Sequence, residues 1–569
     1  MKMRGAKILL KVLEEEGVDT IFGYPGGAVL DIYDELYRTP GIRHIRTHHE
    51  QGAAHAADGY ARASGKVGVC LVTSGPGATN TVTGIATAYM DSVPMVILTG
   101  QVPTKFIGTD AFQESDITGI TRPCTKHNTL VRRIEDLAPT VREAFAIARS
   151  GRPGPVLIDL PKDVMQAETE YMAPEKPGSF HDAPAAPVDE EALQQAFRLL
   201  RESKRPIIIV GGGIVMGKAS EELKSLVETI SIPVASTLMG LGAFPGTHPL
   251  WLGMLGMHGT YYANMAVSNC DLLMTLGARF SDRVTGKIAS FAPHAKSIQI
   301  DIDAASINKV VDIDVPVVGD CKTFLSRLIE LCREAALTVR PEDRTEWLND
   351  IAQWRKKTPL NYTKNGRIKP QEVIETLQRL TDGKAIICTE VGQNQMWTAQ
   401  FYRFTEPQTF LTSGGLGTMG YGFPAAIGAQ VACPDKTVVD IAGDGSIQMN
   451  IQELATAVGN NLPVKIIILN NGCLGMVHQW QEIFYGKRYS HTEIGDSSPD
   501  FVKLAEAYGA VGLRASRPEE IEPVLRKALE TPRTVIAEFI IDPSESVFPM
   551  VSPGGALTDM RLENIIAHD

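Results

Sequence analysis

Short runs of apolar, mostly β-branched residues recur along the chain, and each is followed by a glycine-rich or polar turn and then by a helical pattern. The apolar residues within a run are continuous, which indicates strands covered on both faces, because a strand with one wet face alternates apolar and polar residues. We therefore predict an α/β fold made of doubly wound parallel sheets. The runs lie at residues 67–72, 94–99, 156–160, 207–210, 272–276, 298–302, 385–388, 438–442, 464–469 and 535–541.

The chain divides into three such α/β blocks, in line with the three or four domains expected for 569 residues at roughly 150 residues each. A proline-rich segment at 166–188 is predicted to be a linker, and a charged segment at 340–366 separates the second block from the third. Similar glycine-rich turns at 73–78 and 412–417, each expected to open a helix, hint that the first and third blocks arose by duplication. The predicted boundaries are 1–170, 189–335 and 366–545, with a tail at 546–569.

Composition narrows the class of protein. The net charge of −11 argues against a nucleic-acid or anionic-membrane partner, since both usually require a basic face. The eight cysteines are scattered without a CxxC pair, which is typical of a reducing compartment. The N-terminus enters a charged amphipathic helix, expected at 8–16, rather than a signal sequence, and no window approaches ~18 uninterrupted apolar residues. A cytoplasmic enzyme is the resulting prediction.

The third block carries the strongest candidate site. One strand is expected to end at Asp444 and the next at Asn471, with a helix over 446–458 between them. A right-handed crossover places both side chains at the same edge of one parallel sheet. Carboxylate and amide oxygens suit Mg²⁺, while Gly443 and Gly445 allow backbone N–H groups to approach a diphosphate, as does a helix beginning at Ser446.

Taken singly, Gly-Asp-Gly and Asn-Asn-Gly are more often simple tight turns. The pair at this spacing, bracketed by two strands, resembles the GDG…NN motif of thiamine-diphosphate-dependent enzymes. By that resemblance the backbone carbonyl of Cys473 is the third protein ligand of the metal.

Glu50 is the candidate for activating that coenzyme. It follows a strand expected at 42–46 and stands in His-Glu-Gln-Gly-Ala, followed by Gly-Tyr-Ala-Arg. Alone, a glutamate at a helix start is usually a surface residue matched to the helix dipole. The segment resembles the one that in thiamine enzymes carries a glutamate hydrogen-bonded to N1′ of the aminopyrimidine. The nearby His48, His49 and His55 are not expected to bind zinc, because His48 and His49 are predicted to point to opposite faces of a strand.

Long shared strings extend the resemblance over nearly the whole chain to the acetohydroxyacid (acetolactate) synthase catalytic-subunit family. They include Tyr24-Pro25-Gly26-Gly27-Ala28, Gly108-Thr109-Asp110-Ala111-Phe112-Gln113-Glu114 and Leu474-Gly475-Met476-Val477-His478-Gln479-Trp480. The resemblance implies a transferase that decarboxylates pyruvate to a hydroxyethyl enamine on thiamine diphosphate. Condensation with a second pyruvate or with 2-oxobutyrate then gives 2-acetolactate or 2-aceto-2-hydroxybutyrate, for valine, leucine and isoleucine synthesis.

Site residues follow from positions in the family's motifs. Gln113 is assigned a catalytic role beside Glu50. Arg283 and Trp480 are expected to select the second 2-oxo acid. The alternatives are that Arg283 forms a surface ion pair and that Trp480 packs in the core. The other residues implied to meet substrate are Phe112, Lys126, Lys162 and Val477. Those implied to hold thiamine diphosphate are Tyr24, Gly26, Gly27, Pro76, Asn80, Val391, Gly392, Gln393, Gly417, Met419, Gly443, Asp444, Gly445, Ser446 and Met476.

The middle block alone gives a weak dinucleotide pattern, since Gly-Gly-Gly after a strand is usually just a turn. By the family resemblance it is an FAD-binding domain in which the flavin has a mainly structural role. The residues implied to line FAD are Arg142, Gly211, Gly212, Met239, Met257, His258, Gly277, Arg279, Asp301 and Asp320. Two positions depart from the family pattern: Ser281-Asp282 stands where two aspartates often precede the arginine, and Asn394 stands where many relatives have histidine.

The resemblance also implies a homodimer as the minimum active unit, a homotetramer as the larger form, and a small regulatory subunit. Two alternatives remain open at this point. One is another thiamine enzyme: an FAD-independent acetolactate synthase, or an oxo-acid decarboxylase or oxidase. The other is an inactive homologue that acts as a binding or regulatory subunit, against which the presence of Glu50, Asp444 and Asn471 counts.

Overall fold

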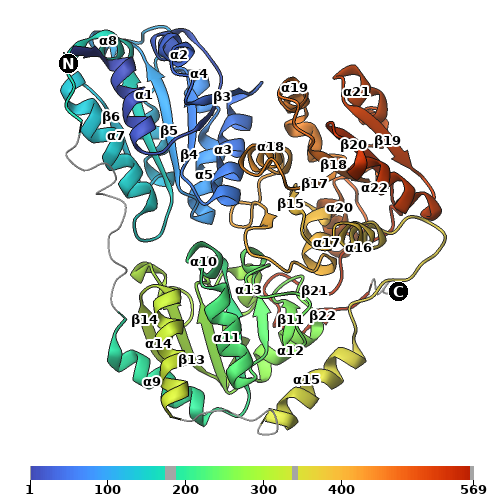
Figure 1. Ribbon diagram of the computed structural model, residues 1–569. Coiled ribbons are helices and arrows are strands. Elements are labelled where there is room, and N and C mark those ends of the chain that lie inside the picture. The colour runs from blue at the N-terminus through green and yellow to red at the C-terminus, as the bar shows by residue number, and fades with distance from the viewer. Residues whose placement is uncertain (1, 174–187, 336–343, 564–569) are drawn as a thin grey trace.

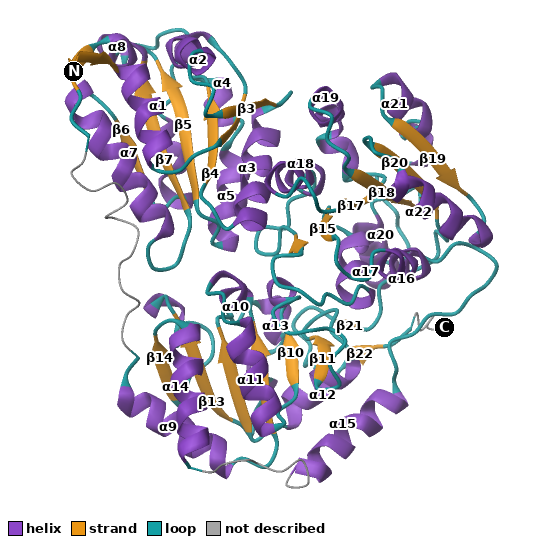
Figure 2. Ribbon diagram, in the orientation of Figure 1, coloured by secondary structure: helices purple, strands orange, loops and turns teal. Residues whose placement is uncertain are grey.

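Three parallel six-stranded sheets form the framework of the computed structural model, which describes residues 2–173, 188–335 and 344–563. They appear as three lobes in Figure 1, blue for the N-terminal, green for the central and orange to red for the C-terminal part. Helices cover both faces of each sheet (Figure 2), which explains the continuous apolar strands. The predicted fold class is confirmed. Of the predicted linker, residues 174–187 lie outside the described residues.

The N-terminal sheet has the order β3-β2-β4-β5-β7-β6. Its strands are β2 (Thr20–Gly23), β3 (Arg43–Arg46), β4 (Gly68–Val72), β5 (Met95–Gln101), β6 (His127–Leu130) and β7 (Pro155–Pro161). Its helices are α1 (Gly5–Glu15), α2 (Leu30–Tyr37), α3 (Glu50–Ser64), α4 (Pro76–Thr79), α5 (Val82–Asp91), α6 (Ile117–Thr121), α7 (Ile134–Arg149) and α8 (Lys162–Gln166). A separate antiparallel pair joins β1 (Lys2–Arg4) to β8 (Glu168–Glu170).

The central sheet has the order β11-β10-β9-β12-β13-β14, the doubly wound order common in dinucleotide-binding folds. Its strands are β9 (Pro206–Val210), β10 (Val234–Ser236), β11 (Trp251–Met254), β12 (Leu272–Leu276), β13 (Lys296–Asp301) and β14 (Val315–Val318). Its helices are α9 (Glu190–Glu202), α10 (Gly212–Met216), α11 (Ser220–Ile230), α12 (Tyr261–Asn269), α13 (Asp282–Thr285) and α14 (Cys321–Glu334).

The C-terminal sheet has the order β16-β15-β17-β18-β20-β19. Its strands are β15 (Ile386–Thr389), β16 (Phe410–Leu411), β17 (Val438–Gly443), β18 (Lys465–Asn470), β19 (Val511–Ala515) and β20 (Val535–Ile540). Its helices are α16 (Pro370–Leu380), α17 (Gln393–Phe401), α18 (Gly422–Ala432), α19 (Leu454–Gly459), α20 (Gly475–Phe484), α21 (Phe501–Ala507) and α22 (Ile521–Glu530). Counted in chain order, its strands are arranged as in the N-terminal sheet, which favours the duplication.

Two segments beyond the predicted blocks pack on the central sheet. Helix α15 (Thr345–Lys357) buries Trp347, whose indole Nε1 donates to the backbone oxygen of Pro206 at 3.0 Å. The tail returns as the antiparallel pair β21 (Met550–Val551) and β22 (Met560–Arg561), and the Val551 amide donates to the backbone oxygen of Met257. Part of the charged separator, residues 344–357, therefore belongs to the packed structure, whereas 340–343 lie outside the described residues. The exact domain boundaries stay a prediction.

The N-terminal and C-terminal lobes meet through two helices rich in small residues, α3 and α18. A Cβ added to Gly59 would lie 2.1 Å from the backbone oxygen of Ala425, and one added to Gly428 would lie 1.9 Å from that of Ala56. Only glycine permits backbones to approach this closely. The two lobes are thus fixed against each other within one chain.

None of the helices in the described part of the chain is both long and apolar enough to cross a membrane. All eight cysteines are free, and six of them are buried. The cytoplasmic location stays a prediction.

Candidate active site

Each sheet has a switch point, where the chain leaves two neighbouring strands in opposite directions and a crevice opens at their carboxyl ends. In the C-terminal sheet it lies between β15 and β17, in the central sheet between β9 and β12, and in the N-terminal sheet between β2 and β4. The glycine-rich segments singled out from the sequence follow these strands. Ligand crevices are therefore expected at all three positions.

A cavity of about 860 Å³ lies where the carboxyl edges of the C-terminal and central sheets face each other. The N-terminal lobe contributes the end of α5 and the turn after α7 to its wall. The sequence-predicted residues that line it are Met239, Met257, His258, Gly212, Gly277, Arg279, Arg283, Asp301, Asp320, Val391, Gly392, Gln393, Gly417, Met419, Gly443, Asp444, Gly445, Ser446, Asn471, Cys473, Met476, Val477 and Trp480.

Asp444 and Asn471 lie together at one edge of this cavity, because β17 and β18 pair in parallel with Gly443 opposite Leu469. Asp444 is 1% exposed, and neither carboxylate oxygen has a hydrogen-bond partner of normal geometry. Burial raises its pKa to about 7, although the nearby backbone N–H groups of Asn471 and Gly472 oppose the rise. A buried carboxylate without partners is costly unless a cation or donor satisfies it.

Asn471 is held in a fixed orientation beside it. Its Nδ2 donates to Oε1 of Gln393 at 3.0 Å, and the Gln393 Nε2 donates to Oε1 of Gln479 at 2.9 Å. Burial also raises the pKa of the Cys473 thiol to about 12, so its sulfur stays protonated at neutral pH. This leaves the Cys473 backbone carbonyl as the group suited to a hard cation.

The segment after Asp444 departs from the prediction. Instead of one helix over 446–458, two 3₁₀ turns (Ile447–Met449 and Ile451–Glu453) precede the short helix α19. Glu453 turns inward and accepts the His48 backbone N–H at 3.1 Å. The backbone leaves the helical conformation at Asn450 (φ −133°), whose side-chain NH₂ donates to the Gly420 backbone oxygen at 2.7 Å, so a continuous helix was the wrong expectation. Likewise, residues 412–417 do not open a helix: they belong to a loop, and α18 begins only at Gly422.

Arg283 and Trp480 are brought together at the open side of the cavity, with the guanidinium carbon 6.0 Å from the indole ring centroid. Arg283 comes from α13 of the central lobe and Trp480 from α20 of the C-terminal lobe. Arg283 also pairs with the exposed Asp282 at 3.0 Å. The structure thus places a cation and an aromatic face side by side, as the sequence analysis expected for selection of a second 2-oxo acid.

The central part of the cavity is lined by two glycine loops pressed together. A Cβ on Gly213 would lie 2.7 Å from the Gly277 Cα, and Gly277 has a φ of +56°. Gly211 lies behind this contact and does not line the cavity. A Cβ added to Gly211 would lie 2.3 Å from the Gly277 backbone oxygen. Asp301 and Arg279 face the same space, and burial raises the pKa of Asp301.

Glu50 does not line this cavity within one chain. It begins α3 beside the N-terminal switch point, where its Oε2 accepts the Asn80 side-chain N–H at 3.0 Å. The other sequence-predicted residues of this lobe also lie outside the cavity: Tyr24, Gly26, Gly27, Pro76, Asn80, Phe112, Gln113, Lys126 and Lys162. The predicted site therefore divides into two halves on different lobes.

Within the N-terminal half, most predicted residues lie near Glu50. A Cβ added to Gly77 would lie 3.4 Å from Glu50 Oε1. A Cβ added to Gly75 would lie 2.8 Å from the Gln113 backbone oxygen, so Gln113 contacts the same turn. The Lys162 ammonium donates to the Gly27 backbone oxygen at 3.1 Å. Lys126 is different, because its ammonium binds the backbone oxygens of Ile147 and Ser150 at the end of α7. A substrate role for Lys126 is not supported.

Two further expectations need correction. Arg142 does not reach the cavity: its guanidinium donates to Glu15 at 2.8 Å and to the Tyr171 hydroxyl at 2.7 Å. His48 and His49 do not lie on a strand, since β3 ends at Arg46; instead the His49 Nδ1 accepts the Gln51 amide and caps α3.

Comparison with known proteins matches the three lobes in order. Residues 3–120 match the thiamine pyrophosphate enzyme N-terminal TPP binding domain, 193–328 the central domain, and 390–539 the C-terminal TPP binding domain. The chain is 49% identical to the acetolactate synthase isozyme 3 large subunit of Escherichia coli, with 98% of each chain covered. It is 52% identical to the probable acetolactate synthase large subunit of Methanocaldococcus jannaschii, covering 98% of this chain and 95% of that one.

The chain belongs to the acetolactate synthase large-subunit family. The resemblance inferred from the sequence is thereby confirmed, together with the three-domain thiamine pyrophosphate enzyme architecture. The individual site residues of this acetolactate synthase chain stay predictions.

Several cavity residues of this acetolactate synthase chain escaped the sequence analysis. Arg152 lines the cavity where Arg142 was expected, donating to the Ser92 hydroxyl at 2.7 Å and pairing with Asp303 at 3.4 Å. It stands in Gly151-Arg152-Pro153, in the turn after α7, ten residues beyond Arg142. Asp91 and Trp397 also line the cavity, and no local sequence pattern distinguishes them from ordinary helix residues.

Proposed function

We propose that this chain catalyses decarboxylation of pyruvate with thiamine diphosphate and condensation of the two-carbon unit with a second pyruvate or with 2-oxobutyrate. The products are 2-acetolactate and 2-aceto-2-hydroxybutyrate, precursors of valine, leucine and isoleucine. The observation that carries the proposal is one cavity that holds both a buried, partnerless carboxylate at Asp444 and the Arg283–Trp480 pair. Coenzyme and acceptor substrate thereby have adjoining places.

Mg²⁺ fits the Asp444 edge. The two unsatisfied carboxylate oxygens of Asp444, the amide oxygen of Asn471 and the Cys473 carbonyl are hard oxygen donors at the ends of neighbouring strands. Mg²⁺ usually completes its shell with phosphate oxygens and water, and a bound diphosphate would supply the former here.

Thiamine diphosphate, when bound, supplies a nucleophilic carbon that attacks the ketone of a 2-oxo acid and accepts the electrons left by loss of CO₂. The protein's part is to bind, orient and move protons. Glu50 would hydrogen-bond the pyrimidine of the bound coenzyme and hold the proton that favours its imino form. Arg283 pairs with the carboxylate of the second 2-oxo acid, and the Trp480 face packs against its alkyl group.

A second copy of the chain supplies Glu50 to each cavity. Support comes from the separation of Glu50 from the Asp444 cavity within one chain. Exposed apolar side chains on the two lobes also suit a contact between copies: Tyr24, Leu30, Phe106 and Phe112 on the N-terminal lobe, and Leu416, Met449 and Val477 on the C-terminal lobe. The active form is a homodimer or homotetramer, and a small regulatory subunit joins it, as the name "large subunit" of the relatives suggests.

FAD fits the central part of the cavity. The close glycine loops leave room for a ligand, Arg279 and Asp301 offer charged partners, and the buried His258 Nδ1 has no hydrogen-bond partner. Burial lowers the pKa of His258 to about 4, so the ring is neutral at neutral pH and Nδ1 can accept or donate a hydrogen bond according to the tautomer. The Ser281-Asp282 departure leaves both residues on the cavity wall, and Asn394 donates to the backbone oxygens of Glu390 and Ile441.

The deciding experiment measures acetolactate formation from pyruvate with thiamine diphosphate, Mg²⁺ and FAD present, and with each omitted in turn. We expect activity to require the first two and the purified protein to carry a flavin spectrum after gel filtration. Oxygen consumption, or acetaldehyde as the main product, would favour the oxidase or decarboxylase alternative. Loss of activity with no component restoring it would favour an inactive homologue.

A further inference from the structure

The loop between β16 and α18, residues 412–421, forms a wall of the Asp444 cavity, between its central part and the part near Asp444. Six of its residues line the cavity: Ser413, Gly414, Gly415, Leu416, Gly417 and Met419. At Gly414 the loop passes the Met239 side chain of the central lobe, and at Gly417 it faces Val391 at the coenzyme end. Its path therefore sets the shape of the space that receives the coenzyme.

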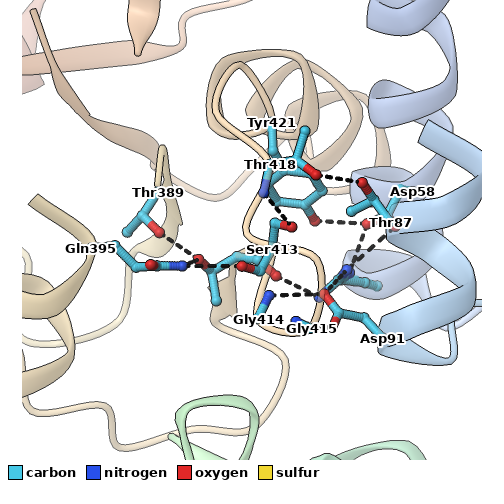
Figure 3. Close-up of polar contacts among 12 residues, drawn as sticks. Asp58, Thr87, Asp91, Thr389, Gln395, Ser413, Gly414, Gly415, Thr418 and Tyr421 are labelled. Atoms are coloured by element: carbon cyan, nitrogen blue, oxygen red, sulfur yellow. Dashed lines mark hydrogen bonds and ion pairs between the residues drawn. The ribbon is translucent and has the colours of Figure 1, made fainter. Parts of the chain in front are cut away.

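The N-terminal lobe holds the middle of this loop, whereas Thr389 and Gln395 of the loop's own lobe bond its first two residues (Figure 3). Asp91, the last residue of α5, is 8% exposed, and its carboxylate accepts the backbone N–H of Gly415 at 2.7 Å and that of Gly414 at 3.0 Å. Three residues further on, the Thr418 hydroxyl bonds the Thr87 hydroxyl of α5 at 2.8 Å. One helix thus fixes two points of the loop.

Helix α3 contacts both ends of the loop, which the C-terminal lobe also holds through Gln395 at Thr412 and Glu390 at Gly420. Arg62 donates to the Thr412 backbone oxygen at 2.9 Å and pairs with Asp91 at 3.1 Å. Asp58 pairs with Arg62 at 2.6 Å and accepts the Tyr421 hydroxyl at 2.6 Å. Asp91 therefore lies at the centre of a network in which its charge is balanced by Arg62 while its oxygens bind the loop.

Space around the glycine pair is limited. A Cβ on Gly415 would lie 2.9 Å from Asp91 Oδ1 and 3.1 Å from an Arg279 guanidinium nitrogen. The loop backbone at Gly415 is therefore closely packed between the Asp91 carboxylate and Arg279 of the central lobe. Hydrogen bonds to an ionised group are about twice as strong as neutral ones, so this anchor is a strong one.

We propose that Asp91 is a positioning residue that holds the 412–421 loop of the C-terminal lobe in the shape that binds thiamine diphosphate. This inference rests on the proposed function, because the coenzyme is the ligand whose binding the loop controls. It assigns to α5 of the N-terminal lobe a part in a coenzyme site built mainly on the C-terminal sheet of the same chain.

The test is the Asp91→Asn variant of the full chain, assayed by titrating the protein, freed of coenzyme and Mg²⁺, with thiamine diphosphate at saturating Mg²⁺. The NH₂ of the new amide must face either the Gly415 N–H or both the Gly414 N–H and Arg62, all of which are donors. At least one hydrogen bond to the loop is therefore lost, and two donors face each other. We expect the dissociation constant of thiamine diphosphate to rise about tenfold. The melting temperature should also fall, because the buried Arg62 loses an ionised partner. The rate at saturating coenzyme should fall less than the affinity does.

The matched control is Asp271→Asn. Asp271 also accepts two backbone N–H groups, from Lys204 at 2.7 Å and Arg205 at 2.9 Å, but at the opposite edge of the central sheet from the cavity. Its variant should bind thiamine diphosphate like the wild type. A variant that keeps its fold more surely is Thr87→Val, which removes only the hydroxyl bound to Thr418 and should weaken coenzyme binding about threefold.

The outcomes separate the two claims. Wild-type protein that binds no thiamine diphosphate would refute the proposed function itself. Wild-type affinity in both Asp91→Asn and Thr87→Val, or an equal loss in Asp271→Asn, would overturn the positioning role alone. If Asp91→Asn does not fold, unchanged affinity in Thr87→Val is sufficient to reject the inference.

Discussion

At the scale of single residues, the site is defined by groups whose burial leaves them incomplete. Asp444 has two buried oxygens without partners, and His258 has one such nitrogen. Both face the cavity, so the missing partners are expected to come from ligands rather than from the protein. Residues such as Lys126 and Arg142, by contrast, are already fully engaged within the fold.

Replacing Glu50 with Gln should preserve the fold and slow coenzyme activation by about 100-fold or more, because an amide cannot hold the proton that favours the imino pyrimidine. The measurements are the exchange rate of the coenzyme's C2 proton and the turnover of pyruvate. The affinity for thiamine diphosphate serves as the control and should change only modestly. Near-normal turnover would refute the role given to Glu50.

Replacing Trp480 with Leu should lower the preference for 2-oxobutyrate over pyruvate by about tenfold, because the aromatic face packed beside Arg283 is lost. The ratio of the two products in a mixed-substrate assay measures this. Homocoupling of pyruvate alone provides the internal control and should fall much less. An unchanged product ratio would show that Trp480 does not select the acceptor.

Glu453 makes a prediction about pH. Burial raises its pKa to about 7, so the folded protein holds a proton there that the unfolded chain releases near pH 4.5. Stability from this group is complete below pH 4.5 and is lost as the pH rises through 7. Glu453→Gln should therefore gain about 1–3 kcal/mol over the wild type between pH 5 and pH 8. The melting temperatures of both proteins at pH 5 and pH 8 measure this. The same difference in melting temperature at the two pH values would contradict the prediction.

At the scale of elements, the contact of α3 with α18 determines how the N-terminal and C-terminal lobes are joined. Helix α3 carries Glu50 at its first residue and Arg62 in its last turn, so one helix holds both the carboxylate proposed to activate the coenzyme and part of the loop network. The approach of the two backbones depends on Gly59 and Gly428. A shift of this contact would move both features together.

Gly428→Ala should cost about 3 kcal/mol or more, because its methyl group would overlap the Ala56 backbone oxygen, which cannot move independently of α3. Gly459→Ala is the matched control, since it lies in α19 with no atom within 4 Å of the added Cβ and should be neutral or slightly stabilising. Thermal unfolding of both variants checks this. Equal melting temperatures would mean that the helix pair tolerates separation.

At the scale of the whole molecule, one chain contains both halves of the site but does not join them. The Asp444 cavity lies between the central and C-terminal lobes, and Glu50 lies at the crevice of the N-terminal sheet. The proposed dimer completes two sites at once, each from two chains, in the manner of a symmetric pair.

This arrangement predicts complementation between inactive chains. When Glu50→Gln and Asp444→Ala chains are unfolded, mixed equally and refolded, half of the dimers are mixed, and each mixed dimer contains one intact site. Activity should return to about a quarter of the wild-type value. Each variant refolded alone is the control and should stay inactive. A mixture as inactive as its parents would mean that both residues act within one chain.

The sequence by itself determined the α/β class, most of the inner strands of each sheet, and the proximity of Asp444 to Asn471. Seven strands of the three described sheets were not among the predicted strands: β2, β6, β10, β11, β14, β16 and β19. The predicted features follow from local pattern, because continuous apolar runs identify buried strands and a right-handed crossover leaves little choice for their neighbours. The family strings likewise identified Arg283 and Trp480, which the structure brings within 6.0 Å. Local rules failed at 446–458, where two turns separated by the non-helical Asn450 replace one helix and Asn450 and Glu453 make tertiary contacts with Gly420 and His48.

Only the tertiary structure decided which side chains from distant segments share a space. Asp91, Arg62 and Gly415 are separated by up to 353 positions, yet they form one network. It also showed that Glu50 stays outside the Asp444 cavity of its own chain and that Arg152, not Arg142, reaches that cavity. The pattern of apolar and polar residues within a segment specifies that segment's secondary structure. Contacts between residues of different lobes depend on how whole lobes pack, which no local stretch of residues encodes.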